Sequence, residues 1–462
     1  MDEELDVELG DEADEGAGPE DRLDSFDPAE RSAALRELAA AAGAPAEGSN
    51  VNMHFHSFFS FNAEDWSPSR IAWESRQAGL YAAGLCDFDV LDGLEEFLQA
   101  GLTLGLRATV NLETRAFVKE YAAADINSPG EPGVAYILGA GFVAKPLAST
   151  PEGRQLAAFR DAARRRNEAL VGRLNERLPA IAVNHVRQVL PLTPQGAATE
   201  RHIVRAYAAR AAAVFPEEHA RARFWAPLLK RTPAQCTALE ADAAAFEEAV
   251  RAALVKRGGL GYVAPDTSTF PPAKAFIDWV RACDAIPTIA WLDGTSAGEA
   301  HARRLLDHLR DAGCAALNII PDRNWNPARP QERKTKIAKL DEIVRLAEAM
   351  ELPINIGTEM NRAGQPFADD LAGPELSRHR AAFLRGAQVM IGHSVLARFA
   401  AAPYLGARAS QEFPRRRARN RFYAAVGALP PLVRESADHL LDVGPERAFA
   451  MLADAAQKVA AR

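Results

Sequence analysis

Cysteine is scarce in this sequence of 462 residues. Its four cysteines are far apart, and no two of them form a Cys-x-x-Cys motif: Cys86, Cys236, Cys283 and Cys314. Cysteines scattered in this way do not indicate a disulfide framework. We therefore expect a reducing compartment and take the cytoplasm as the location of the protein.

Long apolar runs are also missing. No stretch approaches the roughly 20 consecutive apolar residues that a membrane-spanning helix needs, and the N-terminus lacks the basic and apolar regions of a secretory signal. The chain has no clustered stripe of Lys and Arg with interleaved aromatic residues, which nucleic-acid binding would require. The sequence therefore predicts neither a membrane segment nor a specific nucleic-acid partner.

Acidic residues are concentrated at the N-terminus. Residues 1–50 contain 16 Asp and Glu but only three Arg, whereas the remaining 412 residues contain 51 Lys and Arg and 46 Asp and Glu. A segment that is so acidic and poor in large apolar groups cannot bury enough surface to offset its ordering entropy. We expect a disordered tail over residues 1–49, containing a short helix over Pro28–Ala42 that Asp27 would cap. The mildly basic remainder would tolerate an anionic substrate.

From residue 51 onward, short apolar segments alternate with amphipathic helical patterns. The predicted strands are Val51–His56, Ala82–Cys86, Arg107–Leu112, Tyr136–Phe142, Ile286–Trp291, Ala315–Ile320, Leu352–Gly357 and Ala387–Ile391. The predicted helices include Pro68–Ala78, Leu94–Leu102, Pro272–Cys283, Gly298–Ala312 and Glu332–Met350. Such alternation is typical of parallel β/α proteins, and about seven or eight strands of this kind would close a barrel.

One long segment breaks this alternation. Residues 146–259 are rich in Ala and Arg and carry mostly helical patterns over Gly153–Leu178, Glu200–Phe215 and Pro233–Lys256. We interpret them as a helical insertion within a barrel that covers residues 50–406. Residues 407–462 are predicted to form C-terminal helices packed on the outside. The frequent alanine, and the excess of arginine over lysine, we attribute to the composition of a bacterial genome.

Two histidines one residue apart are the most informative feature that is present. His54 and His56 lie in the run Asn52-Met53-His54-Phe55-His56-Ser57. In a β-strand, residues i and i+2 point to the same face, so both imidazoles can reach one metal ion. Imidazole suits zinc, iron, manganese or nickel. A strand with two incidental histidines is the alternative.

Polar side chains also follow the other predicted strands. In a β/α barrel, catalytic groups gather at the carboxyl ends of the strands. The groups found at these positions are Asp87 and Asp89, Glu113 and Arg115, Asp293, Asp322 and Arg323, Glu359 and Asn361, and His393. So many metal-capable or anion-capable groups at strand ends exceed what chance placement would usually give.

The segments at the ends of the first three predicted strands resemble the motifs of the PHP (polymerase and histidinol phosphatase) superfamily. The run Asn52-Met53-His54-Phe55-His56-Ser57 resembles a first motif that is normally Asp-Leu-His-x-His-Ser. Gly84-Leu85-Cys86-Asp87-Phe88-Asp89 resembles a second motif that is normally Gly-Ile-Thr-Asp-His-Asp. Glu113 falls where the third motif places a glutamate that bridges metals.

Two later segments match more loosely. Arg201-His202-Ile203 resembles the Arg-Pro-His segment of members that carry an insertion, and Gly392-His393-Ser394 lies where a final Asp-x-His motif closes the site. The resemblance covers about residues 51–400. It implies a distorted (β/α)7 barrel of the TIM-like type, whose members hydrolyse phosphate esters with two or three divalent metals.

Three positions depart from the family pattern. Asn52 replaces an aspartate, Phe88 replaces a histidine that ligates metal in the family, and Ile391 stands where the final motif has aspartate. A complete trinuclear ligand set is therefore not available. We expect one or two divalent ions (Mn, Zn, Fe or Mg), and the candidate ligands are His54, His56, Glu113, His202, Glu359 and His393.

Several of these assignments have a structural alternative. His202 lies in the first turn of a predicted helix, where a surface role is equally consistent with its position. His393 could instead bond a loop carbonyl after a buried strand, and Asp87 could orient a metal ligand from behind. Glu359 and Asn361 could also belong to a plain turn after a strand.

The function that follows is metal-dependent hydrolysis of a small phosphorylated substrate. A metal would lower the pKa of a bound water, and Asp87 or Asp293 could accept its proton. Arg115 and Arg323 are candidate phosphate clamps because guanidinium matches phosphate geometry, and Asn361 could hydrogen-bond the substrate. The helical insertion could form a lid. The alternative is a PHP-like barrel that has lost catalysis and binds a ligand or partner.

Overall fold

A computed structural model describes residues 18–43 and 45–460 of the chain. Seven strands form one sheet in the order of the sequence, from β1 to β7. They are β1 (Val51–Phe55), β2 (Ala82–Phe88), β3 (Arg107–Phe117), β4 (Val134–Ala140), β5 (Ile286–Trp291), β6 (Ala316–Ile319) and β7 (Ile354–Ile356). All seven correspond to predicted strands.

The sheet curls into a nearly closed barrel. A single bridge joins Phe55, at the end of β1, to Glu359, just beyond β7. The backbone N–H of Glu359 donates to the carbonyl of His54 at 2.8 Å, and that of His56 donates to the carbonyl of Glu359 at 2.9 Å. The predicted fold class, a seven-stranded TIM-like barrel with a helical insertion, is confirmed.

The direction of β4 differs from the parallel arrangement that the sequence predicts. It pairs antiparallel with both β3 and β5, whereas the other neighbouring strands pair parallel. The connection from β3 to β4, residues 118–133, contains only the short 3-10 helix η2 (Lys119–Tyr121). A connection without a crossover helix turns the chain back beside the strand it has left. The carboxyl end of β4 therefore lies at the opposite end of the barrel from the other six.

Helices cover the outside of the barrel, mostly where they were predicted. They are α2 (Pro68–Gln77), α3 (Leu94–Leu104), α9 (Ala273–Ala282), α10 (Ala302–Ala312), α12 (Pro330–Ala349) and α13 (Arg380–Ala400), with a short α11 (Asp322–Trp325) after β6. The predicted strand Ala387–Ile391 is wrong, because these residues belong to α13. Most of this helix is buried, and a short apolar run in a buried helix has the same pattern as a buried strand.

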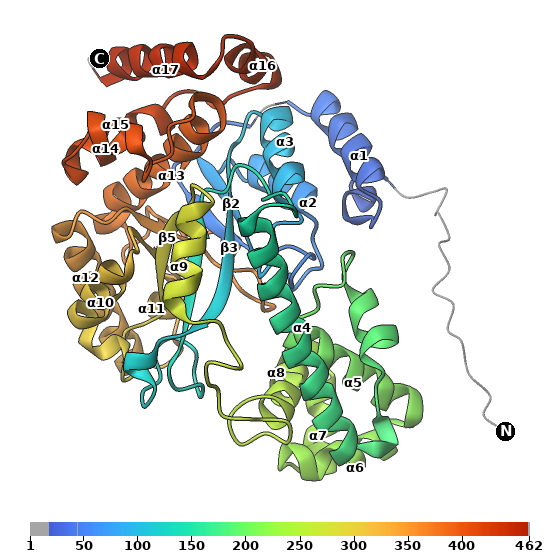
Figure 1. The fold of residues 1–462 in the computed structure, drawn as a ribbon. Helices are drawn as coiled ribbons and strands as arrows, with labels where there is room; N and C mark the ends of the chain where they lie inside the picture. The colour runs from blue at the N-terminus through green and yellow to red at the C-terminus, as the bar shows by residue number, and fades with distance from the viewer. Residues whose placement is uncertain (1–17, 44, 461–462) are drawn as a thin grey trace.

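The insertion is a helical unit with its own core. It comprises α4 (Pro151–Arg177), α5 (Glu200–Val214), α6 (Glu218–Leu229), α7 (Pro233–Glu240) and α8 (Ala243–Leu254). Helix α4 joins the two cores, since Leu156 and Phe159 pack into the barrel core while Leu170 and Leu174 pack into that of the insertion. Figure 1 shows α4 running from the barrel into the insertion.

The two ends of the chain pack on the barrel. The C-terminal helices α14 (Ala407–Glu412), α15 (Arg416–Gly427), α16 (Arg434–Asp442) and α17 (Pro445–Ala460) lie at the end opposite the insertion (Figure 1). Part of the predicted tail is ordered: α1 (Pro28–Ala41) packs on α2 and α3, and Asp27 caps it as predicted. Residues 1–17 of that tail lie outside the described residues. None of the described helices combines the length and apolar character that a membrane crossing requires.

Candidate metal centre

Three buried side chains converge inside the barrel. His54 and His56, from the carboxyl end of β1, point to the same side as their spacing predicts, and Glu113 comes from β3. The Nε2 atoms of His54 and His56 lie 3.6 and 3.7 Å from Oε2 of Glu113. The three ligand atoms all lie within 4.8 Å of one another. We call these residues the triad.

The triad fits a divalent cation. His54 Nε2, His56 Nε2 and Glu113 Oε2 are buried, and none has a hydrogen-bond partner. Buried polar atoms nearly always have a partner, so three unpartnered ones facing one another require an explanation. The two N···O separations are too long for hydrogen bonds but close to the roughly 3.4 Å expected between ligand atoms around a tetrahedral zinc ion. Two imidazoles and a carboxylate are also common ligands of such ions.

Neighbouring polar groups hold the two imidazoles. Nδ1 of His54 lies 3.1 Å from the amide nitrogen of Asn318 on β6, while Oδ1 of this asparagine is buried and has no partner. Rotation of the amide by 180° would let Oδ1 accept from Nδ1–H, which leaves the Nε2 lone pair of His54 free for a metal. Nδ1 of His56 lies 3.5 Å from Oγ of Ser60.

The pKa values of the triad reflect burial and mutual attraction. Burial lowers the pKa of His56 well below its usual range. Burial also disfavours a charge on His54, but the carboxylate of Glu113 outweighs it and raises the pKa of this imidazole. Burial raises the pKa of Glu113. The neutral form of His56 has the free lone pair that a metal ligand needs.

Asp87 supports the site from behind and does not face the triad. Its Oδ1 accepts from the backbone N–H of Ser57 at 2.7 Å and from Oγ of Ser60 at 2.6 Å, and its Oδ2 accepts from Oγ of Ser57 at 2.7 Å. Burial raises the pKa of Asp87 to about 6. Through Ser60, this carboxylate positions His56. The proton-acceptor role predicted from the sequence therefore has no geometric support, because the oxygens of Asp87 already hold the loop after β1.

Two of the departures from the family motifs have a structural explanation. Phe88 stacks on the imidazole of His56, with ring centroids 4.3 Å apart and planes 16° apart. Asn52 uses both ends of its amide: Oδ1 accepts from the backbone N–H of His54 at 3.0 Å, and Nδ2 donates to Oγ1 of Thr358 at 2.7 Å. An aspartate could not donate that second hydrogen bond, so Asn52 joins β1 to the chain after β7.

Glu359 lies beside the triad, but its carboxylate already has a partner. Nη2 of Arg323 donates to Oε2 of Glu359 at 2.6 Å. Although burial acts in the opposite direction, Arg323 and the two triad histidines lower the pKa of Glu359 to about 2. Glu359 and Met360 both have positive φ angles, 66° and 56°. Consecutive non-glycine residues in this region are strained, a feature that clusters at functional sites.

His202 and His393 do not join the triad. Nδ1 of His202 accepts from the backbone N–H of Thr199 at 3.0 Å and so caps helix α5. His393 lies in α13, where its Nε2 donates to the carbonyl of Gly141 at 3.0 Å and its Nδ1 accepts from the backbone N–H of Tyr404 at 3.0 Å. Because β4 runs in the opposite direction, Gly141 follows it at the far end of the barrel. Both ring nitrogens of His393 are used there: the alternative interpretation expected the bond to a loop carbonyl, but placed His393 after a strand and not within a helix.

Asp293 also has a local structural role. Its Oδ1 accepts from the backbone N–H of Thr295 at 2.9 Å, and its Oδ2 lies 3.0 Å from Nζ of Lys336. Burial opposes ionisation, but these contacts lower the pKa of Asp293. Neither Asp293 nor Asp87 lines the cavity described next, so the structure does not bring the two predicted proton acceptors to the site.

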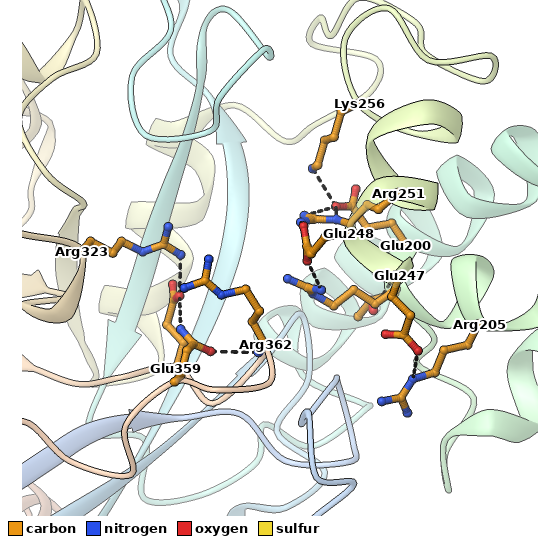
Figure 2. A network of polar contacts seen from close by, with 12 residues as sticks. Glu200, Arg205, Glu247, Glu248, Arg251, Lys256, Arg323, Glu359 and Arg362 are labelled. Atoms are coloured by element: carbon orange, nitrogen blue, oxygen red, sulfur yellow. Dashed lines mark hydrogen bonds and ion pairs between the residues drawn. The ribbon is translucent and has the colours of Figure 1, made fainter. Parts of the chain in front are cut away.

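A cavity of about 900 Å³ separates the mouth of the barrel from the insertion. Its lining includes Phe88, Arg323, Glu359 and Asn361 from the barrel, next to the triad, and Glu200 from the insertion. Figure 2 shows the Arg323–Glu359 pair on one side of this region, and Glu200 with Arg251 and Lys256 on the other. Of the predicted substrate contacts, Arg115, Arg323 and Asn361 all line this cavity.

The side of the cavity formed by the insertion is a dense ion-pair network. Oε1 of Glu200 accepts from Arg251 and lies 2.6 Å from Nζ of Lys256, while its Oε2 lies 3.6 Å from Nη1 of Arg115. Burial acts against ionisation, but Lys256, Arg251 and Arg115 lower the pKa of Glu200 well below its usual range. The network attaches β3 of the barrel to α5 and α8 of the insertion.

Three residues near the site were given no role in the sequence analysis. Asn318 and Tyr136 lie inside predicted strands, and no local pattern showed that they face the site. Asp322 follows β6; its Oδ1 is buried without a partner, and burial raises the pKa of this carboxyl to about 6. The only sequence signal for Asp322 was its position at the end of a strand, and the neighbouring Arg323 has the same position.

No protein-family model matches the chain, and no curated protein matches it. Two solved structures are similar in fold. One is a candidate metal-dependent phosphoesterase from Bifidobacterium adolescentis, with 18% identity, a TM-score of 0.45, and coverage of 74% of this chain and 98% of that one. The other is an amidohydrolase from Chromobacterium violaceum with bound sulfate and no metal, with 15% identity, a TM-score of 0.46, and coverage of 72% and 96%. Similarities this distant do not assign an activity.

Proposed function

We propose that this protein is a metal-dependent phosphoesterase that hydrolyses a small phosphate ester. The observation that carries the proposal is the triad: three buried, unpartnered ligand atoms of His54, His56 and Glu113 that face one another. Two further features support it. The segments that supply the triad resemble the PHP motifs, and the adjoining cavity is rich in arginine and lysine, which suits a phosphorylated ligand.

His54, His56 and Glu113 would hold the metal, with Asn318 fixing the orientation of one imidazole and Ser60 that of the other. A divalent cation in this site would make hydroxide available near neutral pH and offset charge on the phosphoryl oxygens. Two imidazoles with one carboxylate suit zinc, manganese or iron better than magnesium. The triad provides ligands for one ion.

Arg323 is the basic residue that best fits a role in phosphate binding near the triad. It lines the cavity, and its Nε atom is buried without a partner. The carboxylate of Glu359 holds one end of the guanidinium, so less conformational entropy is lost when the other end binds an oxyanion. The charge of Arg323 would stabilise phosphoryl oxygens during ester cleavage.

Turnover of a panel of phosphomonoesters and phosphodiesters, with added manganese, zinc, iron or magnesium, tests this proposal. We expect activity that depends on the metal and falls by at least roughly 100-fold in His56→Ala. His308→Ala is a matched control, because this half-exposed imidazole pairs with Glu120 on the outside of the barrel. Absence of turnover with every ester and metal, or unchanged turnover in His56→Ala, would contradict the proposal.

A protein that binds a ligand without catalysis is the second candidate. The stacking of Phe88 on His56 favours it, because this ring occupies the position of a family metal ligand and borders the cavity. Metal analysis of the purified protein separates the two candidates, since less than about one tightly bound ion per chain would favour the binding protein. A third candidate binds the metal but hydrolyses an amide or another kind of ester. Screening substrates of these classes distinguishes it from a phosphoesterase.

A further inference from the structure

The cavity carries an excess of positive charge. Among the described residues that line it, ten are Arg or Lys and four are Asp or Glu. Most of these cations have an acidic partner. Lys145 and Arg160, for example, both form ion pairs with Asp92. A cation that lines a cavity without an acidic partner is the stronger sign of a site for an anion.

Arg166 of helix α4 is such a cation. Its Nη1 donates to the carbonyl of Thr269 at 3.2 Å, and its Nε is buried without a partner. Among the described residues, no carboxylate lies within ion-pair distance of it. Burial and the nearby charge of Arg115 lower the pKa of Arg166 to about 10. The fold therefore keeps a charge here that its own carboxylates do not neutralise.

Arg166 shares an aromatic ring with Arg115. The guanidinium carbons of these residues lie 4.6 and 4.8 Å from the ring centroid of Phe270. Arg115 retains Glu131 as a partner at 2.9 Å. These cation–π contacts hold both guanidinium groups close to Phe270 without using their N–H groups, which remain available for hydrogen bonds.

Two aromatic rings separate this arginine pair from the triad. Phe88 stacks on His56, and Tyr136 lies beside Phe88 with ring centroids 6.1 Å apart. Tyr136 of β4 pairs directly with Arg115 of β3 in the sheet register. Phe88, Tyr136, Arg115 and Arg166 all line the same cavity.

We propose that Arg166 and Arg115 form a second anion-binding subsite, which holds a phosphate or carboxylate group at the non-reacting end of the substrate. This inference rests on the proposed function, because the reacting end is the phosphate ester at the triad. The substrate class is a phosphate ester that carries a second anionic group, with an intervening body that packs on Phe88 and Tyr136. The insertion supplies Arg166, so it contributes to substrate selection.

The first test measures binding of inorganic phosphate by titration calorimetry to protein freed of metal with a chelator. We expect Arg166→Met to weaken binding by roughly 10- to 100-fold, the loss typical of a hydrogen bond to a charged group. Arg154→Met is the matched control, since this exposed arginine of the same helix bonds the carbonyl of Ser149 and does not line the cavity. His56→Ala should retain phosphate binding. Unchanged phosphate binding in Arg166→Met overturns the subsite.

The second test compares hydrolysis of phenyl phosphate, 4-carboxyphenyl phosphate and 1,4-phenylene bisphosphate. We expect kcat/KM to be higher for one or both of the doubly anionic esters, and their relative values show whether carboxylate or phosphate is preferred. Arg166→Met should reduce this preference roughly 10-fold or more, Arg166→Lys should restore part of it, and Arg154→Met should keep it. A preference unchanged in Arg166→Met overturns the inference. Phosphate binding that depends on Arg166, without hydrolysis of any ester, supports the subsite and contradicts the phosphoesterase proposal.

Discussion

Arg323 and Glu359 form an ion pair of 2.6 Å beside the triad, at the point where the barrel closes. The pair joins the chain after β6 to the chain after β7 and lines the cavity. Arg323 neutralises the charge of Glu359, so Glu113 is the carboxylate of the triad region whose charge remains to be balanced. A single divalent cation already exceeds that one negative charge. The pair therefore favours a site for a single metal.

Glu359→Gln tests whether Glu359 is a metal ligand, as the sequence suggests, or the partner of Arg323. Because Oε2 of Glu359 already binds Arg323, we expect the variant to keep its bound metal. We also expect its free energy of unfolding to fall by roughly 1–3 kcal/mol, since Arg323 would lose its charged partner. Metal analysis and urea unfolding measure the two effects. If metal is lost from Glu359→Gln as completely as from His56→Ala, Glu359 is a ligand.

His393→Ala separates a structural role from a ligand role. We expect the free energy of unfolding to fall by roughly 2–4 kcal/mol, because the substitution leaves a cavity and removes two hydrogen bonds to the backbone. The metal content of the folded variant should equal that of the wild type. Thermal unfolding and metal analysis provide the measurements. A variant that is stable but free of metal would restore His393 as a ligand.

Asp369 should make stability depend on pH. Burial raises its pKa from 3.8 to about 7; Oδ1 accepts from the indole N–H of Trp325 at 2.5 Å, while Oδ2 is buried without a partner. The folded protein therefore holds this proton more tightly than the unfolded chain does. The resulting stabilisation is complete below about pH 4 and is lost as the pH rises through 7. The free energy of unfolding falls by about 4 kcal/mol over this range. Asp369→Asn should be more stable than the wild type at pH 8 and equal to it at pH 4, as measured by urea unfolding. A pH-independent difference would contradict this.

Glu299→Gln should loosen the loop after β5. Oε1 of Glu299 accepts from the backbone N–H of Leu292 at 2.7 Å, and Oε2 accepts from those of Asp293 and Gly294 at 3.1 and 2.9 Å. Glutamine keeps one acceptor and points an N–H₂ group at the other donors. We expect a loss of roughly 1–3 kcal/mol in the free energy of unfolding, accompanied by faster amide hydrogen exchange at Gly294. Exchange at Gly294 that matches the wild type would contradict the role assigned to Glu299.

Local sequence patterns predicted the seven strands of the barrel, together with one false strand at Ala387–Ile391, and the two histidines of the candidate metal centre. Alternation of apolar segments and helical patterns located all seven strands, because these patterns reflect burial of one face of each element. The His54–His56 spacing placed both imidazoles on one side of β1 because a strand repeats every two residues. The long helical stretch between residues 146 and 259 likewise identified the insertion.

Tertiary contacts decided which distant side chains face the candidate metal centre. The short link before β4 reversed this strand and placed Gly141, with His393, at the far end of the barrel. Asp87 and Asp293 are engaged by nearby donors, whereas Arg166 reaches the cavity from the insertion without an acidic partner. Such outcomes depend on how the strands close and on which hydrogen-bond partner each buried group meets, and those neighbours lie far apart in the chain. The sequence by itself determined the strands, the insertion and the His54–His56 pair; the closed barrel determined that Glu113 meets them and that His393 does not.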